Sequence, residues 1–282
     1  MSSVLNALGA PFRRLLGTDK PTVTVVELQG PIGIEARPGR GLSAYSVESS
    51  LKKAFRRKSS KAVVLAINSP GGAPAQARMI MERARGLALE KQIPCISYIE
   101  DVGASGGYLI ALAGEEILAD PFAIVGSIGV VSAGFGFHDA IAKIGVERRV
   151  HTAGEKKLRL DPFMPEKPED AEKLETILDE THRIFIDLVK THRGDRLKGD
   201  ESEIFSGDFF LAGKGEELGL VDGVGDLRQI LKSRYGTDVK IKVITAQRAG
   251  LLGKLGAQIM GGLVDAVAVR LKNDGLNARL GR

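Results

Sequence analysis

The chain has 282 residues, of which 43% are hydrophobic and 27% charged, so it can bury a substantial core and is not disordered throughout. Its net charge of +5 comes from the ends, because residues 1–20 carry +2 and residues 246–282 carry +4, which leaves −1 for the middle. A nearly neutral middle excludes a broad basic groove, so we expect no nucleic-acid partner. The single Cys95 excludes an intramolecular disulfide and a multi-cysteine zinc site.

Apolar, β-branched runs that end at Gly or Pro predict buried strands, and apolar residues at helical spacing predict helices between them. In chain order, the expected elements are a strand at 22–28, a helix at 43–58, a strand at 62–67, a helix at 74–91, a strand at 94–99, a buried helix at 108–114, strands at 116–120 and 123–131, a helix near 138–144, a strand at 147–152, a long charged helix at 168–193, two helices around a Gly turn within 211–231, and a strand at 239–245. This order predicts an α/β fold with mostly parallel sheets flanked by helices.

Two glycine clusters each follow an expected strand: NSPGG at 68–72 and DVGASGG at 101–107. Sites in parallel α/β folds lie at the carboxyl ends of strands, so both clusters can meet in one cleft. A serine at the position of Ser105 is ordinarily an N-cap, but Gly106 and Gly107 in the first helical turn cost about 1 kcal/mol each relative to Ala. Bare backbone is therefore needed there, as it is beside a nucleophile whose oxyanion is bound by N–H groups.

The NSPGG cluster has a plain interpretation as a turn, in which Pro70 fixes φ and a glycine takes a positive φ. The functional interpretation is that Gly71 and Gly72 expose backbone N–H groups at a strand end. Paired with the turn at Ser105, this cluster supplies both sides of an oxyanion hole, with one donor at Gly106 beside the serine and another at Gly71 or Gly72.

The residues alone leave the general base open. Of the four histidines, His138 and His151 lie nearer the candidate site in the sequence, whereas His182 and His192 belong to a charged helix and are expected to be solvated. No histidine is accompanied by a carboxylate motif, so no Ser/His/Asp set can be assembled.

Five motifs in this order resemble the signal peptide peptidase A (protease IV) family of serine peptidases: NSPGG, DVGASGGYLIALAG, GSIGV at 126–130, TAGEKK at 152–157 and SGDFFLAGKGEELGLVDGVG at 206–225. The resemblance spans about residues 22–235 and implies a ClpP/crotonase-like fold and a Ser/Lys dyad that needs no histidine and no cofactor or metal. By motif position, Ser105 is the implied nucleophile, Lys157 the general base, Ser127 the residue that orients the lysine, and Gly72 an oxyanion donor.

A lysine base must be uncharged, whereas an ordinary lysine, with a pKa of ~10.4, is almost fully protonated at neutral pH, so the role requires burial. In the short members of the family, the lysine is supplied by a neighbouring subunit of an octameric ring. The resemblance thus implies a homo-oligomer with shared active sites. It also implies peptide substrates with apolar or small residues near the cut, such as remnants of signal peptides.

The expected organisation is a basic amphipathic segment at 1–20, a peptidase domain at 21–245 and a basic amphipathic tail at 246–282. No signal peptide or membrane-spanning stretch is found, so we expect a cytoplasmic protein whose basic ends are candidates for peripheral membrane contact. Two other functions stay open. One is an inactive oligomeric scaffold or peptide-binding protein of the same fold, and the other is an acyl-CoA enzyme, against which the pattern of Ser105 and Lys157 argues.

Overall fold

The computed structural model describes residues 20–33, 41–57, 59–154 and 156–245. Apart from Lys20, the two basic ends expected from the sequence lie outside the described residues. No helix within the described ranges is both long and apolar enough to cross a membrane.

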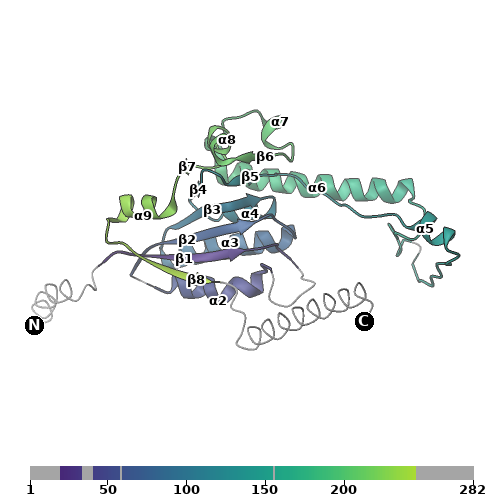
Figure 1. The fold of residues 1–282 in the computed structure, drawn as a ribbon, viewed down its shortest axis with the longest axis horizontal. Helices are drawn as coiled ribbons and strands as arrows, with labels where there is room; N and C mark the ends of the chain where they lie inside the picture. The colour runs from purple at the N-terminus through teal and green to yellow at the C-terminus, as the bar shows by residue number, and fades with distance from the viewer. Residues whose placement is uncertain (1–19, 34–40, 58, 155, 246–282) are drawn as a thin grey trace, which may run out of the picture.

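A mostly parallel eight-stranded sheet forms the centre of the molecule, with neighbouring strands in the order β6-β5-β3-β2-β1-β8 (Figure 1). The strands are β1 (Thr22–Gln29), β2 (Ser60–Ser69), β3 (Cys95–Ala104), β4 (Glu116–Ala119), β5 (Ile124–Gly126), β6 (Phe209–Leu211), β7 (Gly223–Val224) and β8 (Lys240–Thr245). Only the β5–β6 pair is antiparallel among these strands. The first part of β3 pairs with β4 and its last residues pair with β5, so β3 and β5 end side by side at Ala104 and Gly126.

Helices cover both faces of the sheet, as expected for an α/β fold. They are α2 (Ala44–Phe55), α3 (Pro74–Lys91), α4 (Gly106–Ala111), α5 (His138–Lys143), α6 (Pro168–Arg193), α7 (Glu201–Ile204), α8 (Ala212–Glu217) and α9 (Leu227–Tyr235), with a short 3-10 helix at Gly194–Arg196. Alternate side chains of β2 point to opposite faces of the sheet. Leu65 and Ile67 belong to the core with α2, α3 and α4, whereas Val64 and Ala66 pack with Leu231 of α9. The predicted fold class is confirmed.

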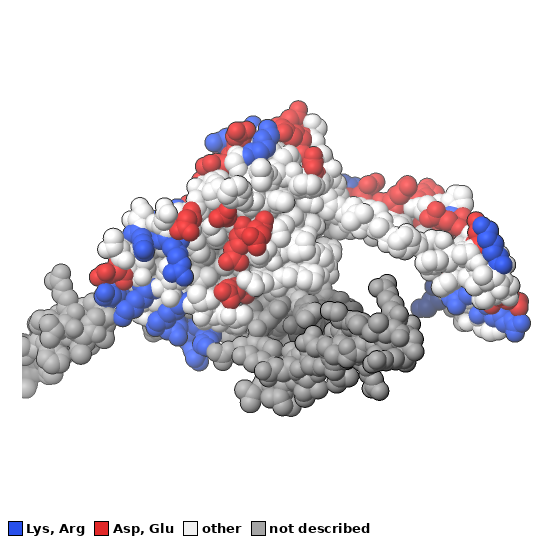
Figure 2. Space-filling model, in the orientation of Figure 1, with Lys and Arg blue, Asp and Glu red and all other residues white. Residues whose placement is uncertain are grey.

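An arm, defined here as residues 132–180, projects from the body, with α5 near its far end and the first part of α6 as its shaft (Figure 1). Its tip is held together locally. Phe137 stacks on Phe163 with ring centroids 5.6 Å apart, and Arg148 lies over Phe163 and pairs with Asp161 at 3.1 Å. Figure 2 shows Lys and Arg side chains at this tip, with Asp and Glu side chains among them.

Several sequence expectations need correction. Residues 147–152 form no strand, because they lie on the arm without a neighbouring strand, and the expected strand at 123–131 is shortened to β5. Conversely, the strand expected at 94–99 continues to Ala104, and the unexpected β6 pairs with β5. The helices expected at 74–91 and 168–193 are confirmed at those bounds.

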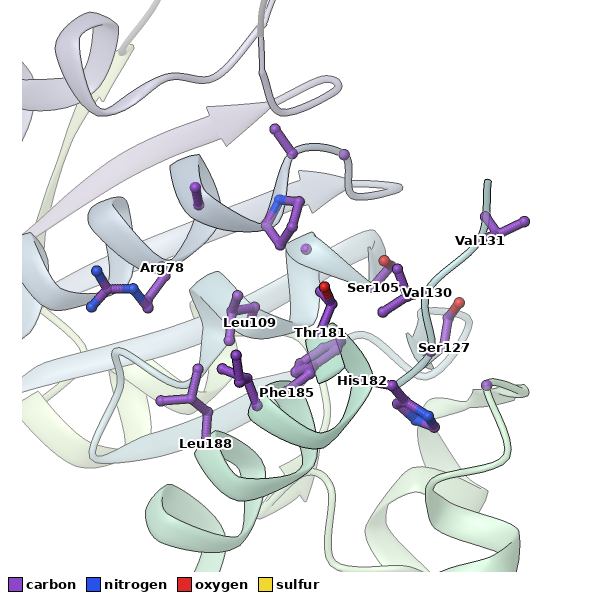
Figure 3. Close-up of a pocket in the computed structure, with 18 of the residues that line it drawn as sticks. Arg78, Ser105, Leu109, Ser127, Val130, Val131, Thr181, His182, Phe185 and Leu188 are labelled. Atoms are coloured by element: carbon purple, nitrogen blue, oxygen red, sulfur yellow. The ribbon is translucent and has the colours of Figure 1, made fainter. Parts of the chain in front are cut away.

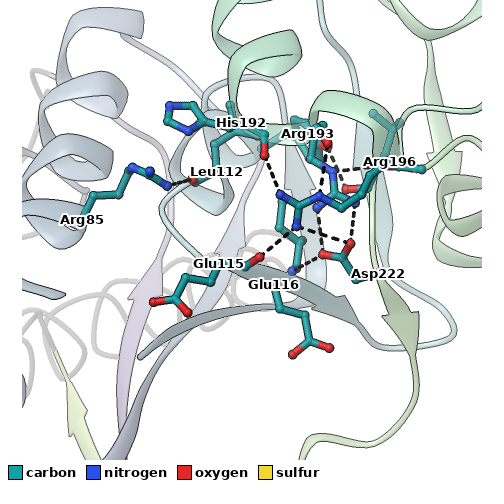
Figure 4. A network of polar contacts seen from close by, with 12 residues as sticks. Arg85, Leu112, Glu115, Glu116, His192, Arg193, Arg196 and Asp222 are labelled. Atoms are coloured by element: carbon teal, nitrogen blue, oxygen red, sulfur yellow. Dashed lines mark hydrogen bonds and ion pairs between the residues drawn. The ribbon is translucent and has the colours of Figure 1, made fainter. Parts of the chain in front are cut away.

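A buried ion pair joins the end of α6 to the sheet (Figure 4). Arg193, only 2% exposed, donates hydrogen bonds of 2.8 and 2.9 Å to the two carboxylate oxygens of Asp222, and its Nε donates to the Gly219 carbonyl. Asp222 also accepts a hydrogen bond from the Ile117 N–H at 2.7 Å. Burial alone would raise the pKa of Asp222, but the hydrogen bonds from Arg193 and Ile117 outweigh it and hold the pKa below its ordinary value.

Replacing Asp222 by Asn should lower the free energy of unfolding at pH 7 by roughly 3 kcal/mol, because the buried Arg193 loses its counter-charge. The difference in free energy of unfolding between the wild type and the Asn variant should be present above pH ~4. It should disappear as the pH falls further, since protonation of Asp222 removes the same charge. Urea unfolding at several pH values measures both effects. Glu201→Gln, which breaks the exposed pair with Lys190, is the matched control and should cost less than about 1 kcal/mol. Equal stability of the Asn variant and the wild type at pH 7 would contradict the assignment.

Candidate active site

A pocket of about 890 Å³ lies where β2 and β3 end (Figure 3). Its walls come from the loop after β2, the start of α4, the segment after β5 and the middle of α6. Ser105, Gly72, Gly106 and Ser127, all predicted from the sequence as site residues, line it together. A pocket of this size accommodates several residues of an extended peptide or a small ligand.

Ser105 occupies the turn between β3 and α4 in a backbone conformation with φ 50° and ψ −122°. This conformation is sparsely populated by residues other than glycine and costs of order 1–3 kcal/mol. Its side chain makes no capping hydrogen bond, so an N-cap role does not account for the serine. The turn is fixed from outside the helix, because the Ser105 N–H donates to the Gly126 carbonyl of β5 at 2.9 Å.

Gly106 and Gly107 are glycines because other backbone lies against them. A Cβ on Gly107 would stand 2.3 Å from the Ser69 carbonyl oxygen, which no side chain tolerates. A Cβ on Gly106 would stand 3.3 Å from the backbone nitrogen of Gly72. The first turn of α4 therefore packs directly against the loop that follows β2.

Gly71 and Gly72 shape the opposite side of this contact, with φ values of 105° and 139°. Two hydrogen bonds anchor their loop to Ile32: the Ile32 N–H donates to the Gly71 carbonyl, and the Ala73 N–H donates to the Ile32 carbonyl, both at 2.8 Å. A Cβ on Gly72 would stand 2.0 Å from that same Ile32 oxygen. Within the described residues, the N–H groups of Gly72 and Gly106 have no hydrogen-bond acceptor, so both are free to bind an oxyanion.

Ser127 follows β5 on the other side of Ser105, also with a positive φ of 51°. Its N–H donates to the Asp208 carbonyl at 2.7 Å, and it lines the pocket. Ile128, the residue after Ser127, contacts α6: its carbonyl oxygen lies 2.8 Å from the Nε2 atom of His182. Because a carbonyl oxygen only accepts, Nε2 carries the proton there.

The expectation that His182 is solvated was wrong, since it is partly buried and lines the pocket. Thr181, Phe185 and Leu188 also face the pocket from α6, and their helical spacing was the signal in the sequence that this part of the charged helix is covered. His138 and His151, expected nearer the site, are instead exposed on the arm.

Lys157 lies on the arm and does not line the pocket of its own chain. Its side chain is exposed, and its backbone N–H closes a turn by donating to the Gly154 carbonyl at 3.1 Å. The loop is tied to α6 by an ion pair between Arg159 and Asp170 at 3.2 Å. The single chain thus brings four of the five predicted site residues together and leaves the lysine apart.

The chain matches the family model described as Peptidase family S49 over residues 88–241, more than half of its length. It belongs to peptidase family S49. The family predicted from the motifs is therefore confirmed, and with it a general relationship to serine peptidases.

Curated relatives extend beyond this chain. It is 27% identical over 274 residues to "Serine protease SPPA, chloroplastic" of Arabidopsis thaliana, covering 91% of this chain and 39% of that protein. It is 53% identical over 235 residues to a Brucella abortus protein called "Na(+)/H(+) antiporter NhaA", covering 82% of this chain and 31% of that protein. The chain thus spans about a third of the length of these relatives.

A solved structure supports the fold. A serine-to-alanine mutant of the 1510-N membrane-bound stomatin-specific protease superposes with a TM-score of 0.50 at 17% identity, covering 80% of this chain and 98% of that one. At this level of identity, the similarity concerns the fold.

Gly72→Ala should lower the free energy of unfolding by more than about 1 kcal/mol, because the added Cβ collides with backbone and the positive φ disfavours it, and it should abolish the peptide hydrolysis expected from the family. Gly86→Ala in the middle of α3 is the matched control: nothing lies within 4 Å of its added Cβ. That variant should gain about 0.5–1 kcal/mol and keep full activity. Thermal unfolding and peptide hydrolysis measure both variants, and a fully active Gly72→Ala enzyme would contradict the proposed role of this loop.

Proposed function

We propose that the protein is a serine endopeptidase in which Ser105 is the nucleophile and Lys157 the general base. The observation that carries this proposal is the convergence of a strained, uncapped Ser105 with two free backbone N–H groups in one pocket. Strained backbone held by surrounding structure is typical of a residue positioned for chemistry.

In the proposed reaction, the Ser105 Oγ attacks the peptide carbonyl carbon while its proton passes to the Lys157 amine. The N–H groups of Gly72 and Gly106 bind the negative oxygen that develops. The C–N bond then breaks, and Lys157 returns the proton to the leaving amine, which leaves an ester on Ser105. Water, deprotonated by Lys157, hydrolyses the ester and restores the serine hydroxyl.

A second copy of the chain is proposed to bring Lys157 to this pocket. Two observations support the arrangement: Lys157 is exposed on the arm, and the described lining of the pocket contains no lysine. The arm also exposes large apolar side chains, with Phe135 80% and Ile144 73% exposed, as a surface that packs against another chain does. Docking would bury the amine, which a base requires, and would bring it to Ser127 for orientation.

The substrates are proposed to be apolar peptides, with signal-peptide remnants as one natural source. Leu109, Phe185 and Leu188 give the pocket an apolar wall beside Ser105 that suits an apolar side chain. We place this activity in residues 21–245. The basic segments at 1–20 and 246–282 are proposed to make peripheral contact with anionic membranes.

Ser105→Ala and Lys157→Ala should each reduce kcat/KM for a fluorogenic peptide by at least roughly 10³-fold, since nucleophile and base act as a unit. Wild type should also be labelled by a fluorophosphonate probe, and both variants should not. His182→Gln, which removes the histidine that lines the pocket, should keep labelling. An unlabelled wild type would favour an inactive peptide-binding protein, and labelling that depends on His182 but not on Lys157 would refute the dyad.

Mixing the two inactive variants tests whether sites are shared between copies. After dissociation and reassembly, a mixture of Ser105→Ala and Lys157→Ala chains should regain activity, because some pockets receive a serine from one chain and a lysine from another. With random mixing of equal amounts, about a quarter of such pockets carry both intact residues. Failure to regain activity, with mixing shown by subunit-specific tags, would mean that each chain completes its own site.

A further inference from the structure

The pocket has an unbalanced charge. The residues that line it include no aspartate or glutamate, and its titratable side chains are Arg78 and His182. Arg78 comes from the exposed side of the second turn of α3. An anionic group that enters this pocket therefore meets a guanidinium and no carboxylate on the walls.

Arg78 differs from the other arginines of α3 in having no partner within the described residues. Arg83 donates from Nε and Nη2 to both carboxylate oxygens of Glu48 at 2.8 Å, and Arg85 donates to the Leu112 carbonyl at 3.3 Å. A guanidinium presents five N–H donors in a planar fork that fits a carboxylate. On Arg78 this fork is available to a ligand.

The position of Arg78 says where such a ligand group would sit. In Figure 3, Arg78 lies across the pocket from Ser105 with its guanidinium pointing away from the serine, Leu109 lies between them, and Phe185 and Leu188 lie below on α6. A peptide whose scissile carbonyl is at Ser105 would lay an apolar side chain on the middle wall. A group further along the same peptide would reach Arg78.

We propose that Arg78 forms a carboxylate subsite, which selects peptides that carry a negative charge some residues away from the cleaved bond. This inference deepens the proposed peptidase function and rests on it. The carboxylate can belong to an Asp or Glu side chain or to the free C-terminus of a short peptide, since a guanidinium binds both in the same way.

The test compares matched peptides with the same apolar residues around the cut. In the first pair, one peptide carries Glu and the other Gln at the same position, and this position is moved residue by residue on either side of the cleaved bond. In the second pair, one peptide ends in a free carboxylate and the other in an amide. For wild type, kcat/KM should be about tenfold higher for the acidic member at the position that reaches Arg78, as expected for a hydrogen-bonded charge pair. The pair that shows the preference identifies the source of the carboxylate.

Arg78→Gln should lower kcat/KM for the acidic peptide about tenfold relative to the neutral peptide and so remove the preference, and Arg78→Glu should reverse it. Lys53→Gln, which removes an exposed charge from α2 outside the pocket, should keep the preference and so exclude an effect of net charge. Equal rates for acidic and neutral peptides at every position, or a preference unchanged in Arg78→Gln, would overturn the subsite.

Peptide binding to Ser105→Ala, followed by fluorescence anisotropy, separates this inference from the catalytic proposal. Acid-selective binding that is lost in the Ser105→Ala, Arg78→Gln double variant would support the subsite even if no peptide were cleaved by the wild type. Cleavage that depends on Ser105 without charge selectivity in either assay would leave the peptidase standing and refute the subsite.

Discussion

The structure of the site depends on one close contact between two stretches of bare backbone. Gly71 and Gly72 after β2 lie against Ser105 and Gly106 at the start of α4, so near that a Cβ on Gly71 would stand 2.8 Å from the Gly106 nitrogen. This approach keeps the N–H groups of Gly72 and Gly106 at the same end of the sheet, beside the serine. Side chains at these glycines would separate the two loops and remove the pair of donors.

Parallel pairing brings this contact about. Because β2 and β3 are parallel neighbours, both end at the same edge of the sheet, and so do the loops that follow them. The last residue of β3 is paired with Gly126 at the end of β5, and the Ser105 N–H bonds to that glycine's carbonyl. The register of β5 on β3, and not the local sequence around Ser127, therefore places Ser127 on the same pocket as Ser105.

This explains why much of the body, and the meeting of four of the five candidate residues in one pocket, were predictable. Strands such as 62–67 and helices such as 74–91 carry local signals in apolar spacing and in Gly and Pro, and the glycine clusters mark where backbone meets backbone. The motifs also predicted Lys157 as the base, but a local pattern does not say whether that lysine would reach the pocket of its own chain or that of another. The misjudged strand at 147–152 and the pocket side of α6 near His182 also depend on distant partners, which a single sequence does not display.

The two halves of the proposed dyad are held by separate sets of interactions. The body positions Ser105 through β3, β5 and the glycine contact, while the arm positions the lysine loop through the ion pair between Arg159 and Asp170 and the stack of Phe137 on Phe163. The two sets of interactions have no residue in common, so Ser105 and the lysine loop can each be positioned before two chains associate. Under the proposed arrangement, folding prepares the oxyanion site in every chain, and association between chains decides whether that site acquires a base.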